Sequence, residues 1–247
     1  MAMQIIDKLS AKNKDAFSNP PVTIGFLGDS VTNGCFEVQT VKNASGGEDY
    51  HVVYEPEHSY SAHVRRILSM LYPKAQINIV NAGISGDTAP GGLYRIDRDL
   101  LPFHPDLTVV CFGLNDSGLG DAGIEQYQNA LHGIIRRLKE TGSEVILMTP
   151  QPVCTYVHNF VHDEYLRDLA KKFVDLSASG SFDRYMNAAR EAALQEQVPL
   201  CDVYAKWIAL YQGGVDITEL LSNYINHPTR EMTELFAWSL VHTMFGV

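Results

Sequence analysis

Short apolar segments alternate with amphipathic helical segments along this 247-residue chain, and this alternation limits the folds that it can adopt. Residues 22–27 and 107–112 are largely apolar runs of the kind found in strands covered on both faces. The other segments with a strand pattern are 76–80, 145–148 and 198–203. Helices are expected over residues 58–71, 124–138, 164–176 and 183–197, and over a closing segment from Met232 to Leu240. Strand and helix in repeated alternation predict an α/β fold, with a parallel sheet between two layers of helices.

The length fits one domain over residues 1–247, with residues 1–20 as an N-terminal extension that packs on it. Acidic residues exceed basic ones by 29 to 19, and no run of Lys or Arg is longer than two, so we expect no nucleic-acid partner. The four cysteines are scattered without a C-x-x-C pair, and two of them, Cys111 and Cys201, lie in apolar strand-like runs and are interpreted as reduced core residues. No apolar run reaches 18 residues and the first 20 residues are polar, so we expect a cytoplasmic protein without a membrane partner.

Three polar motifs follow predicted strands directly: Gly28-Asp29-Ser30, the segment from Asn81 to Thr88, and Gly113-Leu114-Asn115-Asp116. Right-handed crossovers bring the carboxyl ends of parallel strands to one edge of the sheet, where open α/β folds bind ligands. Each motif alone fits ordinary structure, because Ser and Asp cap helices and Gly, Asn and Asp are common in turns. Their convergence on one edge favours a catalytic site.

A hydroxyl nucleophile with a base and oxyanion donors can be assembled from these motifs. Ser30 supplies the hydroxyl, which needs a positioned base to become reactive. His227 is the preferred base: it precedes Pro228, a residue that favours the first position of a helix, so we expect His227 at the positive end of the last helix, where the dipole keeps its imidazole neutral. The Asn115 amide and the Gly86 backbone N–H can donate to a developing oxyanion.

The ordered set of motifs resembles the SGNH hydrolase superfamily, also called the GDSL esterases and lipases. Gly28-Asp29-Ser30 with Thr32 and Gly34 matches its first block, and the second block is matched from Asn81 through Ser85-Gly86-Asp87-Thr88. Gly113-x-Asn115-Asp116 matches the third block and His227-Pro228 part of the last. The resemblance implies a three-layer α/β/α sandwich with a five-stranded parallel sheet, similar to flavodoxin. It also implies Ser30 as nucleophile, His227 as general base, and an oxyanion hole made by Ser30, Gly86 and Asn115, with no cofactor.

The last block departs from the family in one respect. The family usually has an Asp three residues before the His, and here that position is Tyr224, with Asn223 beside it. The group that orients His227 is therefore Asn223, a backbone carbonyl, an acid from elsewhere, or none, and we favour a Ser–His dyad oriented by a neutral acceptor. The sequence Asn226-His227-Pro228-Thr229 resembles that of a subset of bacterial family members.

Two long segments, 37–57 and 151–163, lie at the expected active edge and are interpreted as loops that shape a substrate site. Asp29, Tyr156, His158 and Asn226 are candidate substrate-binding residues, and aromatic residues of the chain can line a sugar-shaped cleft: Tyr156, Phe160, Tyr165 and Trp207. His158 and His162 have the i, i+4 spacing of a helical metal pair, but the H-E-x-x-H pattern is missing, so no metal is predicted.

The leading hypothesis is a serine carboxylester hydrolase that forms an acyl-Ser30 intermediate and removes acetyl groups from carbohydrate. Its substrate is then a small-molecule or oligosaccharide ester. A lysophospholipase or thioesterase acting on longer acyl chains is the first alternative, and a non-catalytic protein that binds an acylated ligand is the second. Apolar helices at the domain edge are compatible with a homo-oligomer.

Overall fold

The computed structural model of the chain describes residues 2–247, apart from the side chains of Thr40 and Glu48. Five strands form the central sheet in the order β4-β1-β5-β6-β7, and all neighbouring pairs are parallel. The strands are β1 (Val22–Gly28), β4 (Ile77–Gly83), β5 (Leu107–Cys111), β6 (Glu144–Thr149) and β7 (Leu200–Asp202). Ile24 of β1 lies opposite Ile79 on β4 and opposite Leu107 on β5, the two neighbours of β1 in the sheet. The predicted five-stranded parallel sheet is confirmed.

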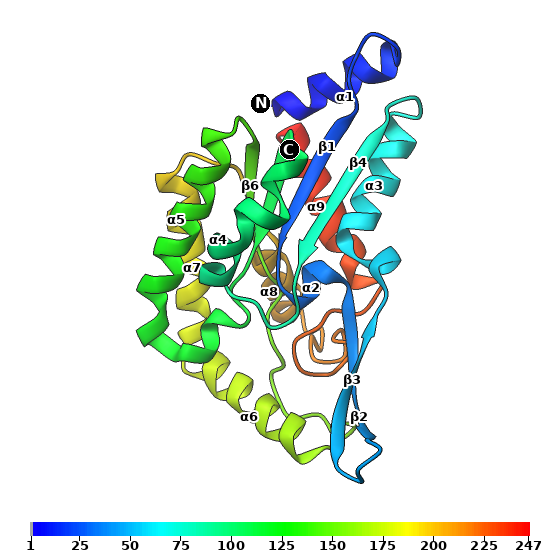
Figure 1. The fold of residues 1–247 in the computed structure, drawn as a ribbon. Helices are drawn as coiled ribbons and strands as arrows, with labels where there is room; N and C mark the ends of the chain where they lie inside the picture. The colour runs from blue at the N-terminus through cyan, green and yellow to red at the C-terminus, as the bar shows by residue number, and fades with distance from the viewer. Residues whose placement is uncertain (1) are drawn as a thin grey trace.

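Helices cover both faces of this sheet (Figure 1). Helices α3 (Tyr60–Leu71) and α9 (Met232–Phe245) pack together on one face, and α4 (Ala89–Asp99), α5 (Ile124–Glu140) and α7 (Ser181–Gln195) pack on the other. The remaining helices are α1 (Gln4–Lys14), α2 (Ser30–Asn33), α6 (Glu164–Ala178) and α8 (Val203–Gln212), with 3-10 turns at Pro56–His58, Leu101–Phe103 and Asp116–Gly123. The predicted three-layer α/β/α sandwich is therefore confirmed.

The N-terminal segment packs on the end of the sheet that lies away from the three motifs (Figure 1). The Glu144 carboxylate at the start of β6 accepts hydrogen bonds from the backbone N–H groups of Gln4 (2.9 Å) and Ile5 (2.7 Å). A carboxylate at a helix N-terminus satisfies free N–H groups and complements the helix dipole, so Glu144 stabilises α1 from a distant part of the chain. Within residues 2–247, no helix combines the length and the apolar character needed to cross a membrane.

The strand order places a topological switch point between β1 and β5. From β1 the chain goes to β4 on one side, then crosses to β5 on the other. In sheets of this order a crevice opens beyond the carboxyl ends of the two strands at the switch, and it is the usual place for a ligand. Ser30 directly follows β1, and Asn115 follows β5, so the chain places both residues at this crevice.

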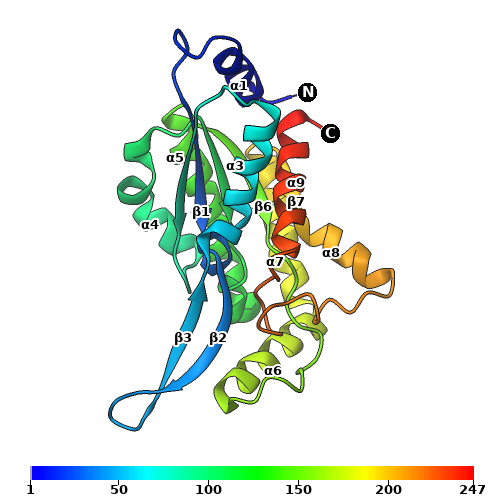
Figure 2. The same cartoon turned by 90° about the vertical axis from the view of Figure 1, so that its right-hand side faces the viewer.

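Residues 37–57, interpreted as a loop from the sequence, lie largely in an antiparallel hairpin made of β2 (Cys35–Lys42) and β3 (Glu48–Tyr54). The hairpin projects past the carboxyl edge of the sheet, at the same end of the molecule as α6 (Figure 2). Most of its side chains are exposed or half-buried, as in a two-stranded ribbon with no core of its own. Because most of the hairpin lies outside the core, the strict alternation of apolar and polar residues that reveals a strand is missing.

The closing helix begins at Met232 and not next to His227. Pro228 instead forms an isolated antiparallel bridge with Leu221, and Thr229 donates its N–H to the Leu220 carbonyl (2.9 Å). The prediction that Pro228 opens the last helix is therefore wrong. Proline lacks an N–H and is equally suited to the edge of a short bridge, so the dipeptide His227-Pro228 does not by itself locate a helix start.

Candidate active site

Ser30 occupies the first position of α2, a single helical turn that follows β1. The turn from strand to helix requires glycine at position 28, because a Cβ there would lie 2.1 Å from Thr32 Oγ1 and 2.6 Å from the Cys111 carbonyl oxygen. Asp29 is the N-cap, and its Oδ1 accepts from the Val31 N–H at 3.0 Å. Asp29 is buried, with 1% exposure, and its observed role is that of a helix cap, so its assignment as a substrate-binding residue stays a prediction.

Ser30, His227 and the Phe36 backbone form a continuous hydrogen-bonded chain. Ser30 Oγ lies 3.0 Å from His227 Nε2, and His227 Nδ1 lies 2.7 Å from the Phe36 carbonyl oxygen. A carbonyl oxygen can only accept, so Nδ1 carries the proton and Nε2 is left to accept the Ser30 hydroxyl proton. This is the tautomer that a general base next to a serine needs. Both side chains are buried.

The His227 imidazole is kept neutral by its burial. Desolvation is the largest influence and lowers the pKa of His227 below its ordinary value of 6.5; the hydrogen bond to Phe36 and the nearby Glu37 carboxylate act in the opposite direction. The sequence argument expected a neutral imidazole because of a helix dipole. That cause is wrong, since α9 begins five residues later at Met232.

Asn223 holds the backbone of the His227 loop. Its Oδ1 accepts from three successive backbone N–H groups, those of Ile225 (3.0 Å), Asn226 (2.9 Å) and His227 (3.0 Å). Its Nδ2 donates to Asn226 Oδ1 at 2.9 Å. The partner of the imidazole is thus the Phe36 carbonyl and not Asn223, which corrects the orienting role assigned to Asn223. A neutral backbone acceptor occupies the place where the family usually has an Asp.

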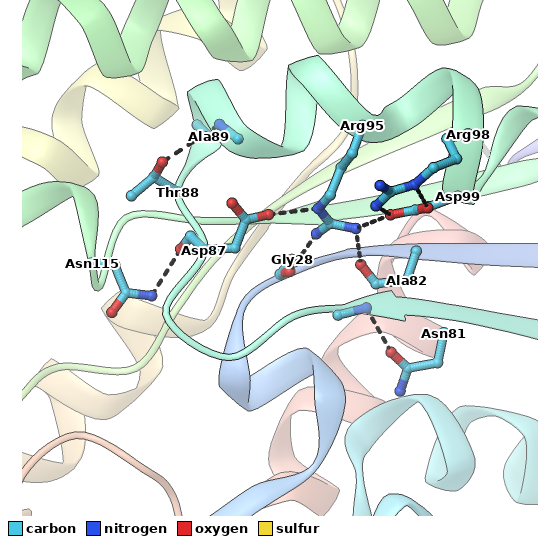
Figure 3. A network of polar contacts seen from close by, with 12 residues as sticks. Gly28, Asn81, Ala82, Asp87, Thr88, Ala89, Arg95, Arg98, Asp99 and Asn115 are labelled. Atoms are coloured by element: carbon cyan, nitrogen blue, oxygen red, sulfur yellow. Dashed lines mark hydrogen bonds and ion pairs between the residues drawn. The ribbon is translucent and has the colours of Figure 1, made fainter.

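The expected oxyanion donors lie on a rigid network of strand ends (Figure 3). Asn115 Nδ2 donates one proton to the Asp87 carbonyl oxygen at 2.8 Å, which fixes the amide and leaves its second proton for a ligand. Gly86 adopts φ 78°, a conformation that favours glycine, in the loop between β4 and α4. The loop is therefore held on one side by Asn115 and carries a backbone that glycine alone adopts without strain.

Arg95 ties this loop to the sheet. Its guanidinium donates to Asp87 Oδ2 (2.6 Å), to the Gly28 carbonyl at the end of β1 (2.9 Å) and to the Ala82 carbonyl in β4 (2.7 Å). Arg95 and Asp87 are both largely buried, so the pair is shielded from solvent. One side chain thus fixes the relative positions of the first two motifs, and Asn115 joins the third motif to them.

Two buried carboxyl groups lie behind the site. Burial raises the pKa of Asp29 to about 7 and that of Asp116 to about 6. Asp116 Oδ1 accepts from the Ala89 N–H at 2.9 Å. The second carboxyl oxygen of each residue has no hydrogen-bond partner among the described residues. Partial protonation near neutral pH limits the negative charge next to the oxyanion donors, where full ionisation would oppose catalysis.

The other candidate substrate-binding residues have structural roles. His158 is buried and stacks on Tyr224 at 4.1 Å; its Nδ1 accepts from the Phe160 N–H (3.2 Å), so Nε2 donates to Glu219 (3.0 Å). Asn226 is engaged with Asn223. Both side chains thus have structural partners, and their assignment to substrate binding stays a prediction. Residues 156–162 are not helical, so His158 and His162 do not share a helix face, and no group of three or more metal-ligating residues occurs in the described chain.

A groove of about 570 Å³ lies between the hairpin and the segment before α6. Its lining comes from β2, from residues 160–166 and from Ser222, Asn223 and Tyr224 of the loop that carries His227. Phe160 is exposed in it, and Tyr156, 39% exposed, is tied to Asp216 at its hydroxyl (2.8 Å) outside it. Trp207 is fully buried in the core, which corrects its placement in a cleft.

Sequence reasoning missed the contribution of the hairpin to the site. Phe36 acts through its backbone carbonyl, and no side-chain pattern announces such a role. Arg230, three residues after His227, and its partners Glu37 and Glu55 were also missed. The available signal was a charged residue close to the expected base, together with two acidic residues at the ends of a segment without regular periodicity.

Comparisons with known proteins identify the family of the chain. The sequence profile of the GDSL-like Lipase/Acylhydrolase family matches residues 26–235. An acetylxylan esterase of Geobacillus stearothermophilus is 28% identical over 134 residues, which cover 51% of this chain and 58% of the esterase. Esterase TesA of Pseudomonas aeruginosa is 39% identical over 70 residues, 28% of this chain and 34% of TesA. The chain thus aligns with less than two thirds of the length of either relative.

Solved structures show the same fold. A two-domain esterase active on acetylated mannans superposes with a TM-score of 0.68 at 19% identity, over 98% of this chain and 53% of that protein. The family profile spans most of the chain and includes Ser30, Gly86, Asn115 and His227. The chain therefore belongs to the GDSL-like lipase/acylhydrolase family.

Proposed function

We propose that this protein is a serine carboxylester hydrolase that removes short acyl groups, above all acetyl, from carbohydrate through an acyl-Ser30 intermediate. The observation that carries the proposal is the hydrogen-bonded chain from Ser30 through His227 to the Phe36 carbonyl. It ends at a hydroxyl beside the expected oxyanion donors, at the switch point of the sheet.

Each residue has a defined part in the proposed reaction. His227 Nε2 takes the Ser30 hydroxyl proton while Oγ attacks the ester carbonyl carbon. The carbonyl oxygen becomes an oxyanion that accepts hydrogen bonds from the Asn115 amide and from the backbone N–H groups of Ser30 and Gly86. The imidazolium returns its proton to the leaving alcohol oxygen as the C–O bond breaks, which leaves acyl-Ser30. A water activated by His227 attacks the acyl carbon, and the acid and free Ser30 are released.

The Phe36 carbonyl can replace the usual carboxylate because it selects the correct tautomer. In a well-known Ser-His-Asp triad, exchange of the Asp for Asn lowers turnover about 10⁴-fold, since the amide favours the wrong tautomer of the histidine. A carbonyl oxygen presents only an acceptor to Nδ1, so the Nδ1–H form persists. What is lost is part of the electrostatic stabilisation of the imidazolium, and Glu37 offsets some of it.

Two observations support a carbohydrate ester as substrate. The groove beside the His227 loop combines polar side chains, such as Gln39 and Lys42, with the rings of Phe160 and Tyr224. Sugars are bound by that combination of hydrogen-bonding groups and aromatic faces, whereas a long acyl chain needs a continuous apolar tunnel. Relatives in sequence and structure are named for acetylated xylan and mannan.

The test is hydrolysis of p-nitrophenyl acetate, butyrate and octanoate and of acetylated xylo- and manno-oligosaccharides by wild type and Ser30→Ala. Ser69→Ala, an exposed serine on α3, is the matched control. We expect the highest kcat/KM on acetyl esters, release of acetate from the oligosaccharides, and loss of activity in Ser30→Ala alone. A rate that rises toward octanoate would transfer the assignment to a lysophospholipase or thioesterase, and no turnover of any ester would favour a binding protein.

A further inference from the structure

We infer that Arg230 is a positioning residue that locks the β2–β3 hairpin onto the His227 loop and so holds the Phe36 carbonyl against the imidazole. The ion pairs of Arg230 thus act on His227 indirectly. They hold the Phe36 carbonyl in place, and this carbonyl accepts the hydrogen bond from the imidazole. This inference rests on the proposed esterase function.

The Phe36 carbonyl is available because the hairpin is irregular at this point. Cys35 pairs with Tyr54 and Val38 pairs with Val52, so two residues of β2, Phe36 and Glu37, oppose one residue of β3. An extra residue of this kind breaks the hydrogen-bonded ladder locally and redirects backbone groups. The bulge therefore releases the Phe36 carbonyl from strand pairing, and His227 Nδ1 takes it as acceptor.

Arg230 binds both strands of the hairpin at this bulge. Its Nε and Nη2 donate to the two carboxylate oxygens of Glu55 at 2.7 and 2.6 Å, just after β3. Its Nη1 and Nη2 donate to the two oxygens of Glu37 at 2.7 and 3.0 Å. The guanidinium carbon also lies 4.4 Å from the centre of the Phe36 ring. Two bidentate pairs and a stacked ring fix the residues on either side of the carbonyl in direction as well as distance.

Arg230 and His227 belong to the same loop, so this loop contacts the bulge at two neighbouring residues. From the loop, the His227 ring reaches Phe36 and the Arg230 side chain reaches Glu37, its neighbour in the bulge. The guanidinium holds the pKa of both Glu37 and Glu55 below the ordinary value, and the two carboxylates raise that of Arg230, so all three groups stay charged at working pH. If Arg230 is removed, the bulge loses both ion pairs that tie it to the loop, and the hydrogen bond from His227 Nδ1 to the Phe36 carbonyl is left without their support.

The first test is kinetic and uses Arg230→Met, Arg230→Lys and the control Arg66→Met, which breaks an exposed ion pair between Arg66 of α3 and Glu234 of α9. We expect kcat on p-nitrophenyl acetate to fall up to about 100-fold in Arg230→Met with KM nearly unchanged, because a displacement of about 1 Å at a catalytic group costs that much. Arg230→Lys keeps the charge but lacks the planar set of guanidinium donors, so its kcat should lie between those of Arg230→Met and the wild type. Arg66→Met should match the wild type.

The second test reads the imidazole directly and does not depend on turnover. The ¹⁵N shifts of His227, assigned with His227→Asn, report which ring nitrogen carries the proton. We expect Nδ1–H in the wild type and in Arg66→Met, and a mixture of the two neutral tautomers in Arg230→Met. Glu37→Gln weakens one of the two ion pairs of Arg230 and should change the tautomer ratio less than Arg230→Met does. It provides the test if Arg230→Met does not fold.

An unchanged tautomer together with an unchanged kcat in Arg230→Met and Glu37→Gln would overturn the positioning role. Failure of the proposed function looks different: the wild type would then hydrolyse no ester, while the tautomer would still respond to Arg230→Met.

Discussion

Replacement of Asp29 by Asn should stabilise the protein increasingly as the pH rises from 3.8 to about 7. Asp29 is buried, and one carboxyl oxygen accepts from the Val31 N–H while the other has no partner among the described residues. Asn caps a helix as well as Asp does, so Asp29→Asn keeps the cap of α2 and removes only the ionisable group.

The magnitude follows from the pKa of Asp29, which burial raises from 3.8 to about 7. The folded state therefore holds a proton that the unfolded chain has already released above pH 3.8. The stabilising contribution is complete below that value and is lost as the pH rises to about 7. Each pH unit in this range costs about 1.4 kcal/mol, so the wild type should lose roughly 2–3 kcal/mol from Asp29 between pH 5 and pH 7.

Urea unfolding of wild type and Asp29→Asn at pH 5 and pH 8 measures this contribution, with the exposed Asp7→Asn on α1 as control. The free energy of unfolding of Asp29→Asn should gain roughly 2–3 kcal/mol on the wild type between the two pH values, and Asp7→Asn should gain almost nothing. A parallel pH dependence of wild type and Asp29→Asn would refute the claim that Asp29 is held protonated by burial. The pKa of Asp116 is raised in the same direction, so this residue adds to the pH dependence of the wild type and of Asp7→Asn.

Two further predictions concern catalysis. Asn115→Ala should lower kcat about 10²–10³-fold with little change in KM, because the amide donates to the oxyanion only as charge develops. Asn78→Ala, an exposed amide on β4, is its control, and an equal rise in KM instead would assign Asn115 to ground-state binding. The midpoint of the acidic limb in the pH profile of kcat/KM should lie below pH 6.5, since burial lowers the pKa of His227. A midpoint at or above pH 6.5 would mean that the imidazole is solvated in the working enzyme.

The fold could be predicted because buried parallel strands leave a strong trace in sequence. The runs that became β1 and β5 are apolar almost throughout, and each is followed at once by a polar motif. Strand alternation with helices then places Ser30, Gly86 and Asn115 at one edge without any knowledge of their contacts. Helix α4 was not predicted because its first turn contains Pro90, Gly91 and Gly92, residues that are typical of turns.

The rest of the site could not be predicted because it is made by backbone groups and by tertiary burial. The acceptor for His227 is a carbonyl released by a bulge at Phe36, and any residue type can supply a carbonyl. The neutral state of His227 was expected for the wrong reason, since its cause is burial by distant segments and not the end of a helix. The role predicted for Asn223 was wrong for a similar reason. Asn223 is close in sequence and accepts from the backbone N–H of His227, whereas the imidazole donates to Phe36, which is 191 residues away.

The central claim is that Ser30 carries the acyl group during turnover. The most direct measurement is mass spectrometry of peptides from the enzyme quenched with acid during reaction with p-nitrophenyl acetate, for wild type, His227→Ala and Ser30→Ala. We expect an acetyl group on the peptide with Ser30 in the wild type, a much slower appearance in His227→Ala, and none in Ser30→Ala. Acetate release by the wild type with no acetyl on Ser30, or with acetyl on another residue, would contradict it.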